Sequence, residues 1–124
     1  MAQVRYIVKD VTEAIAFYVS HLGFKLVRQF GPAMAILQRE DLQLWIAGPM
    51  ASASKPLADG SRPASGGWSR FVIAVNDLDE MVAELGGRGV RFRGEVVAGP
   101  GGRQILCEDP SGNPIELFQA AVAE

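Results

Sequence analysis

The chain contains one sequence pattern twice, and this internal repeat constrains the fold more than any single motif. Residues 3–23 read QVRYIVKDVTEAIAFYVSHLG, and residues 70–90 read RFVIAVNDLDEMVAELGGRGV. A shift of 67 residues places Arg70 on Gln3 and Asp77 on Asp10. Each copy has an alternating strand pattern, then an aspartate, then apolar residues at helical spacing. We therefore predict two structurally equivalent halves that face each other across a shared concave surface.

Each half is predicted to form a strand, a helix and three further strands. Asp10 or Thr12 can cap the first helix, Gly23 can end it, and Asp77 can cap the second helix. The fold class is therefore α+β, with two tandem βαβββ modules whose curled sheets form the shared cavity and whose helices lie outside. The strand patterns cover residues 3–8, 24–30, 33–39, 42–47, 70–75, 90–97, 103–108 and 115–119.

We expect a single domain over residues 1–124, with one module at about 1–50 and the other at about 66–122. Between them, residues 48–67 are rich in Gly, Pro, Ala and Ser, which is typical of a loop or linker. A connection of this length is long for a compact domain and is often functional.

Composition limits the class of partner and the location. The net charge of −2 provides no basic stripe for nucleic acid and no polybasic patch for a membrane surface. No apolar run approaches the roughly 18 residues of a membrane span. The chain has one cysteine, Cys107, and no visible signal peptide, so we expect a cytoplasmic protein that contacts neither nucleic acid nor membrane.

Strand alternation gathers an unusual set of side chains on the face away from the helices. Aromatic rings and polar groups are mixed there, which suits the lining of a ligand pocket better than a sheet facing bulk water. Trp68, at the end of the long connection, is a further candidate. The set on the open face is Gln3, Arg5, Gln43, Trp45, Arg70, Glu116 and Phe118.

Two segments carry a family resemblance: FYVSHLGF at residues 17–24 and EDPSGNPIELF at residues 108–118. With the two strands that lead to Asp10 and Asp77, they resemble the vicinal oxygen chelate superfamily, also called the glyoxalase, bleomycin-resistance and extradiol dioxygenase superfamily. The resemblance implies sheets that curl around a cavity, in which some members hold a divalent metal ion. It also implies a homodimer, because two-module members commonly pair.

The metal ligands that the resemblance implies fall on Gln3, Gln43, Arg70 and Glu116. Arg70 cannot ligate, because a guanidinium is always charged and has no available lone pair. The only histidine, His21, is expected on the surface at the end of the first helix, away from this face. We therefore expect no metal or other cofactor, and an ion pair between Arg70 and Glu116. The alternative is a divalent metal bound by Gln3, Gln43 and Glu116.

The resulting hypothesis is a small-molecule-binding protein that sequesters an aromatic natural product or antibiotic. Trp45, Trp68 and Phe118 would stack on the ligand. The side chains expected to hydrogen-bond its polar groups are Gln3, Arg5, Gln43 and Arg70. Two alternatives stay open: a metal-dependent glyoxalase-like lyase, isomerase or dioxygenase, and metal-free catalysis with Glu116 as general base. An exposed apolar face on the curled sheet also predicts a homodimer.

Overall fold

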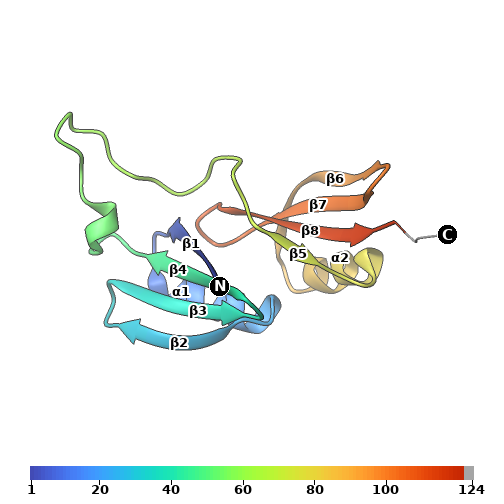
Figure 1. The fold of residues 1–124 in the computed structure, drawn as a ribbon, viewed down its shortest axis with the longest axis horizontal. Helices are drawn as coiled ribbons and strands as arrows, with labels where there is room; N and C mark the ends of the chain where they lie inside the picture. Colours follow the sequence, from blue (N-terminus) through green and yellow to red (C-terminus); the bar gives the residue numbers. More distant parts are fainter. Residues whose placement is uncertain (122–124) are drawn as a thin grey trace. The chain divides into compact units, whose positions relative to one another are not determined.

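A computed structural model describes residues 1–121 of the protein. The chain forms two compact units, one of residues 1–67 with 110–113, the other of residues 68–109 with the chain from Pro114 onward. Figure 1 shows the predicted order of strand, helix and three strands in both halves. The elements are β1 Ala2–Ile7, α1 Val11–His21, β2 Lys25–Phe30, β3 Met34–Arg39, β4 Leu42–Ala47, η1 Ser52–Ser54, β5 Val72–Ala74, α2 Leu78–Gly87, β6 Arg91–Gly99, β7 Gly102–Glu108 and β8 Pro114–Ala120.

Each unit contains one mixed four-stranded sheet, which confirms the predicted α+β class. The first sheet has the order β1-β4-β3-β2, and the second has the equivalent order β5-β8-β7-β6. In both, the first strand of the module pairs in parallel with its last strand, and the other pairs are antiparallel. The shared cavity and the single domain of 1–124 stay predictions.

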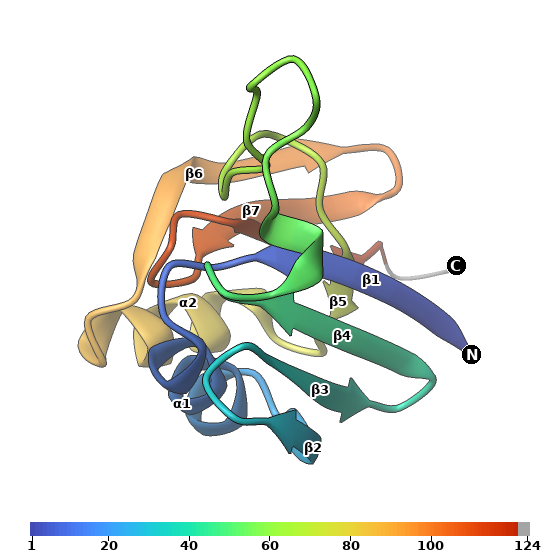
Figure 2. The same cartoon turned by 90° about the vertical axis from the view of Figure 1, so that its left-hand side faces the viewer.

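Helix α1 covers one face of the first sheet and begins where the sequence predicts. Figure 2 shows it beside β3 and β4. The side chain of Asp10 accepts a hydrogen bond from the backbone of Glu13 at 2.9 Å, so Asp10 is the cap. Gly23, at φ 73°, follows the last turn in the left-handed conformation that ends helices. The side chains buried between helix and sheet include Tyr6, Tyr18, Leu37, Leu44 and Ile46.

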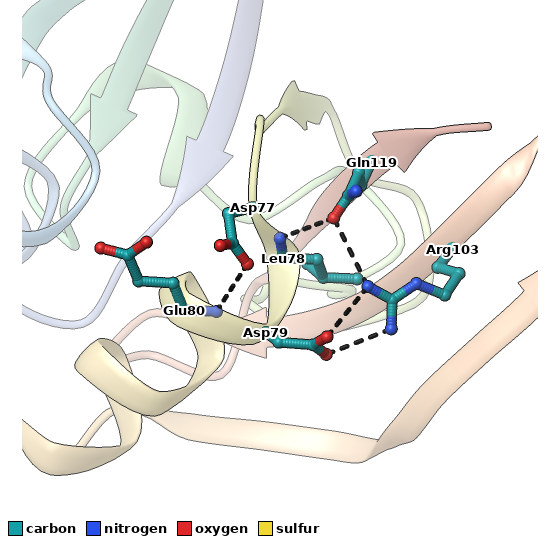
Figure 3. A network of polar contacts seen from close by, with 6 residues as sticks. All are labelled: Asp77, Leu78, Asp79, Glu80, Arg103 and Gln119. Carbon is teal, nitrogen blue, oxygen red and sulfur yellow. Dashed lines mark hydrogen bonds and ion pairs between the residues drawn. The ribbon is translucent and has the colours of Figure 1, made fainter. Parts of the chain in front are cut away.

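Several side chains form hydrogen bonds at the first turn of helix α2, as Figure 3 shows. Asp77 accepts from the backbone of Glu80 at 3.0 Å, repeating the cap of α1 at the 67-residue offset. Gln119 of β8 accepts from the backbone of Leu78 at 2.8 Å. Arg103 of β7 donates to both carboxylate oxygens of Asp79, at 3.1 and 3.2 Å. Side chains from two strands therefore fix the first turn of α2 on the second sheet.

Strand β5 is shorter than the predicted 70–75, so Arg70 precedes the strand. The pairing of β5 with β8 extends one residue beyond each end of β5. The backbone carbonyl of Phe71 accepts from the N–H of Glu116, and the backbone N–H of Val75 donates to the carbonyl of Phe118. At the other edge, β6 and β7 form a hairpin around Gly99–Gly102. Gly102 is required there, because a Cβ would collide with the carbonyl oxygen of Gln119.

The connection from β4 to β5 is long, as predicted, and the first unit holds it at several points. Ser54 donates to the carbonyl of Gly48 at 2.7 Å. The side chain of Asn113 accepts from the backbone of Gly66 and donates to the carbonyl of Ile7, both at 2.8 Å. The DPSGNP turn thus fixes the end of the connection against the end of β1. No helix within residues 1–121 has the length and apolarity to cross a membrane.

Candidate functional site

The open face of the first sheet contains a row of three glutamines. The strand register places Gln3 of β1 opposite Gln43 of β4, and Gln43 opposite Gln38 of β3. Gln3 donates to the Oε1 atom of Gln43, and Gln43 donates to the Oε1 atom of Gln38, each at 3.5 Å. Gln38 donates to the carbonyl of Glu40 at 3.2 Å. The amides therefore all point the same way along the row, and the Oε1 atom of Gln3 is its acceptor end.

The next row of this face contains Arg5 and Trp45, which are opposite each other in β1 and β4. The guanidinium carbon of Arg5 lies 5.2 Å from the centre of the Trp45 ring. The indole N–H of Trp45 donates to Oε1 of Gln43 at 3.2 Å, which joins the two rows. Trp45 is half-buried, so its ring is held in place while part of its surface is open. This arrangement provides an aromatic surface, a cation and amide groups on one face.

Sequence reasoning missed Gln38. The signal was present, because Gln38 alternates with the buried Leu37 and faces Gln43 across β3 and β4. Finding it required the pairing register of two antiparallel strands, which the 67-residue repeat does not provide.

On the second sheet, Arg70 and Glu116 form the ion pair that the sequence predicted. The Nη2 and Nε atoms of Arg70 donate to Oε1 of Glu116 at 2.8 and 3.1 Å. The Glu116 side chain is only 11% exposed, and that of Arg70 is 29% exposed. The remaining nitrogen, Nη1, donates to the carbonyl of Trp68 at 3.2 Å. Arg70 thus connects the buried carboxylate to the backbone at the start of the module.

A second arginine on this face was not predicted. Arg93 of β6 places its guanidinium carbon 4.7 Å from the centre of the Trp68 ring. Its Nε atom donates to Glu108 at 2.6 Å. Strand alternation in β6 could not reveal Arg93 reliably, because the register shifts between Arg93 and Val97. Trp68 itself is 68% exposed, so one face of the ring is open while Arg93 lies over the ring.

These groups surround a hollow of about 220 Å³ in the second unit. It brings together two of the predicted site residues, Trp68 and Arg70. Phe118 does not line it but is half-buried on β8, opposite Gln104. Glu116 contacts Arg70 without lining the hollow itself. The residues that line it are Trp68, Arg70, Arg93, Glu95, Val97, Gln104, Ile105 and Leu106.

The residues at the family's metal positions do not fit a divalent metal. On the first sheet, Gln3 and Gln43 offer only amides, which bind each other. On the second, the one carboxylate, Glu116, is held by a guanidinium that carries the charge a metal ion would supply. No three His, Cys, Asp or Glu side chains within residues 1–121 are grouped closely enough to hold a metal ion.

The one histidine and the one cysteine of the chain are both away from the open faces. His21 is half-buried rather than on the surface, because its ring packs 5.3 Å from that of Phe17 on α1. Its Nδ1 atom is buried without a partner among the described residues. Cys107 is fully buried, and burial raises the pKa of its thiol to about 12. A buried thiol with that pKa is a poor nucleophile at neutral pH.

Several solved structures are similar to the chain over almost its whole length. A member of the glyoxalase/bleomycin resistance protein/dioxygenase superfamily from Sphaerobacter thermophilus DSM 20745 is 28% identical with a TM-score of 0.76, covering 96% of this chain and 95% of that one. TnmS3, an antibiotic binding protein from Streptomyces sp. CB03234, is 28% identical with a TM-score of 0.72, covering 96% and 93%. Lactoylglutathione lyase from Agrobacterium tumefaciens shares the fold at 19% identity, with a TM-score of 0.76 and coverage of 96% and 92%.

No curated protein matches the chain significantly in sequence. The family model described as Glyoxalase/Bleomycin resistance protein/Dioxygenase superfamily matches residues 1–117, which span both modules. The repeated βαβββ module, the parallel pairing of first and last strands and this match agree with one another. The chain therefore belongs to the glyoxalase/bleomycin resistance protein/dioxygenase superfamily.

Proposed function

We propose that this protein binds an aromatic small molecule, such as an antibiotic or another natural product, and sequesters it without a metal and without chemical conversion. The observation that carries the proposal is the contact between Arg70 and Glu116. At the positions where metal-dependent members would need ligands, this chain has a carboxylate already neutralised by a guanidinium. The protein then keeps the open sheet faces of the fold but lacks the set of metal ligands that metal-assisted catalysis needs.

The open face of the first sheet supports the proposal through its aromatic and amide groups. A planar ligand can stack on the exposed part of Trp45 beside the Arg5 guanidinium. The Oε1 atom of Gln3, at the end of the glutamine row, can accept a hydrogen bond from a hydroxyl or amine of the ligand. The other amides of the row are oriented by their neighbours, so little ordering is needed on binding.

The hollow on the second sheet supports the same class of ligand. Trp68 and Val97 provide exposed apolar surface there, at 68% and 60% exposure. Both arginines are paired with glutamates, so the hollow favours an aromatic ligand with polar substituents over a multiply charged anion. TnmS3, described as an antibiotic binding protein, is 28% identical and gives independent support for a binding role.

The experiment uses the fact that the chain has only two tryptophans. In Trp45→Phe the fluorescence reports on Trp68 alone, and in Trp68→Phe it reports on Trp45 alone. A panel of aromatic natural products is titrated into the parent and both variants, with and without EDTA. We expect a ligand that changes the fluorescence equally with and without EDTA and that mass spectrometry recovers unchanged. Loss of binding with EDTA, or conversion of the ligand, would favour a metal-dependent enzyme instead.

The open faces also favour a homodimer, because they expose aromatic surface that a partner copy could cover. Light scattering at micromolar concentration measures the oligomeric state, and a mass of one chain would contradict this part of the proposal. The cytoplasmic location stays a prediction of the sequence.

A further inference from the structure

A second hollow, of about 260 Å³, lies in the first unit between the end of β1 and the connection from β4 to β5. Figure 2 shows this connection in green beside β1. None of its lining residues belongs to the hollow on the second sheet or to the rows of Gln3 and Trp45. The residues that line it are Ile7, Val8, Lys9, Pro49, Ser54, Arg62, Pro63, Ala64 and Ser65.

Hydrogen bonds on both sides fix the walls of this hollow. On the connection, Ser54 is tied to the carbonyl of Gly48, and Gly66 is tied to the side chain of Asn113. At the end of β1, the same Asn113 donates to the carbonyl of Ile7, and just beyond it the hydroxyl of Ser111 accepts from the backbone of Lys9 at 2.8 Å. One side chain, Asn113, therefore sets the spacing of the two walls. A preformed hollow of this kind costs a ligand little ordering.

The charges around this hollow all have one sign. Lys9 and Arg62 both line it, and no acidic side chain does. Within residues 1–121, neither the Lys9 ammonium nor the Arg62 guanidinium forms an ion pair or a hydrogen bond. This contrasts with Arg70 and Arg93, which glutamates neutralise. Two cations without partners are available for an anionic group.

The rest of the lining is mainly apolar. Ile7, Pro49, Pro63 and Ala64 provide hydrocarbon surface. The hydroxyl of Ser65, which is half-buried, has no partner within the described residues and can donate a hydrogen bond. An apolar body beside two cations and a hydroxyl complements a molecule with one hydrophobic part and one anionic end.

We propose that this hollow is a second ligand site, specific for a compact hydrophobic carboxylate such as an aryl carboxylic acid. The ring contacts the prolines and Ile7, and the carboxylate accepts from Arg62, through up to two parallel bonds, and from Lys9. The proposal goes beyond the sequestration of an aromatic molecule on the sheet faces and does not depend on it.

The test titrates benzoate into the full-length protein labelled with ¹⁵N and follows backbone amide shifts. We expect shifts at residues 7–9 and at Ala64 and Ser65, which line the hollow. Benzamide, a neutral analogue of similar shape, lacks the charge-assisted hydrogen bonds to Lys9 and Arg62, and inorganic phosphate, an anion without a hydrophobic part, lacks the apolar contacts. Each is therefore expected to bind at least about tenfold more weakly than benzoate.

Two charge variants and a matched control locate the site. Lys9→Gln and Arg62→Gln are each expected to weaken benzoate binding about tenfold. Lys55→Gln removes a cation from the same connection without touching the lining, so it should bind like the parent. Ala64→Leu fills the hollow without changing charge and should abolish the shifts. The amide spectrum of each variant also reports whether it is folded.

Three results would overturn the proposal. Benzamide could bind as well as benzoate, Lys55→Gln could weaken binding as much as Arg62→Gln, or the shifts could appear at Trp45 or Arg70 and not around the hollow. The third result would place the carboxylate at the sheet faces, and it would leave the proposed sequestering function intact.

Discussion

Arg70 donates from both Nε and Nη2 to a single carboxylate oxygen of Glu116, at 3.1 and 2.8 Å. Gln3, which corresponds to Arg70 at the 67-residue offset, instead faces Gln43 through a long amide contact of 3.5 Å. The two halves thus share a fold and differ in the chemistry at matching positions. One half carries a neutral amide pair, and the other carries a buried carboxylate that depends on a cation.

Removing that cation should destabilise the protein. Arg70→Met leaves Glu116 with its side chain 11% exposed and without its charged partner, and we expect a loss of about 2 kcal/mol in the free energy of unfolding. The double variant Arg70→Met/Glu116→Gln removes the charge as well and should recover part of this loss. Urea denaturation measures both. Equal stability of Arg70→Met and the parent would mean that the ion pair makes no net contribution.

A histidine at the same position should create metal affinity. Arg70→His frees Glu116 and places an imidazole close to it, and imidazole with carboxylate is a suitable ligand pair for Zn²⁺ or Ni²⁺. We expect the variant to bind either ion more tightly than the parent in calorimetric titrations. Arg88→His, at the residue that follows the last turn of α2, is the control for a histidine added beside an exposed glutamate, Glu84. The interpretation fails if the control gains as much affinity as Arg70→His.

Gln119 should contribute more to the stability of α2 than the exposed arginine beside it. Gln119→Met leaves the backbone N–H of Leu78, a fully buried residue, without its acceptor, which costs about 1–3 kcal/mol. Arg103→Met removes a solvent-exposed pair with Asp79 and should cost much less. Thermal unfolding of the two variants shows directly which substitution lowers the stability more. The reverse order would show that the Arg103 contact dominates the network in Figure 3.

Much of the fold follows from the repeat, because strand alternation and capping aspartates are local signals. Asp10 and Asp77 both cap helices, and both modules have the predicted strand order. The features that the sequence did not reveal depend on the exact pairing register of the strands, even between neighbouring strands. Gln38 reaches the glutamine row only through the β3–β4 register, and a register shift in β6 hides Arg93.

The candidate site was also predictable only in part from the sequence. The ion pair of Arg70 with Glu116 was predictable, because the repeat places arginine where Gln3 is in the first copy. The hollow beside β1 was not, although the connection was recognised as unusually long. Its walls are set by Asn113, 47 residues from its partner Gly66, and no local pattern reports such a contact.

Cys107 should make stability fall at alkaline pH. Burial raises the pKa of its thiol from 9.0 to about 12, so the folded protein retains the proton over a range in which the unfolded chain loses it. The stabilisation is complete below pH 9.0 and is lost progressively as the pH rises towards about 12. Cys107→Ala should unfold with a smaller dependence on pH in this range. At pH 8, iodoacetamide should label the parent only in denaturant, and rapid labelling of the folded protein would contradict the burial.

We propose that this member of the superfamily functions without a metal ion, and elemental analysis of the purified protein is the direct measurement. The protein is expressed in medium supplied with nickel, zinc, iron and manganese, exchanged into metal-free buffer, and its metal content is measured by mass spectrometry. We expect far less than one ion of any of these metals per chain. One bound ion per chain, lost in Glu116→Gln, would contradict this proposal and would point to a metal-dependent enzyme.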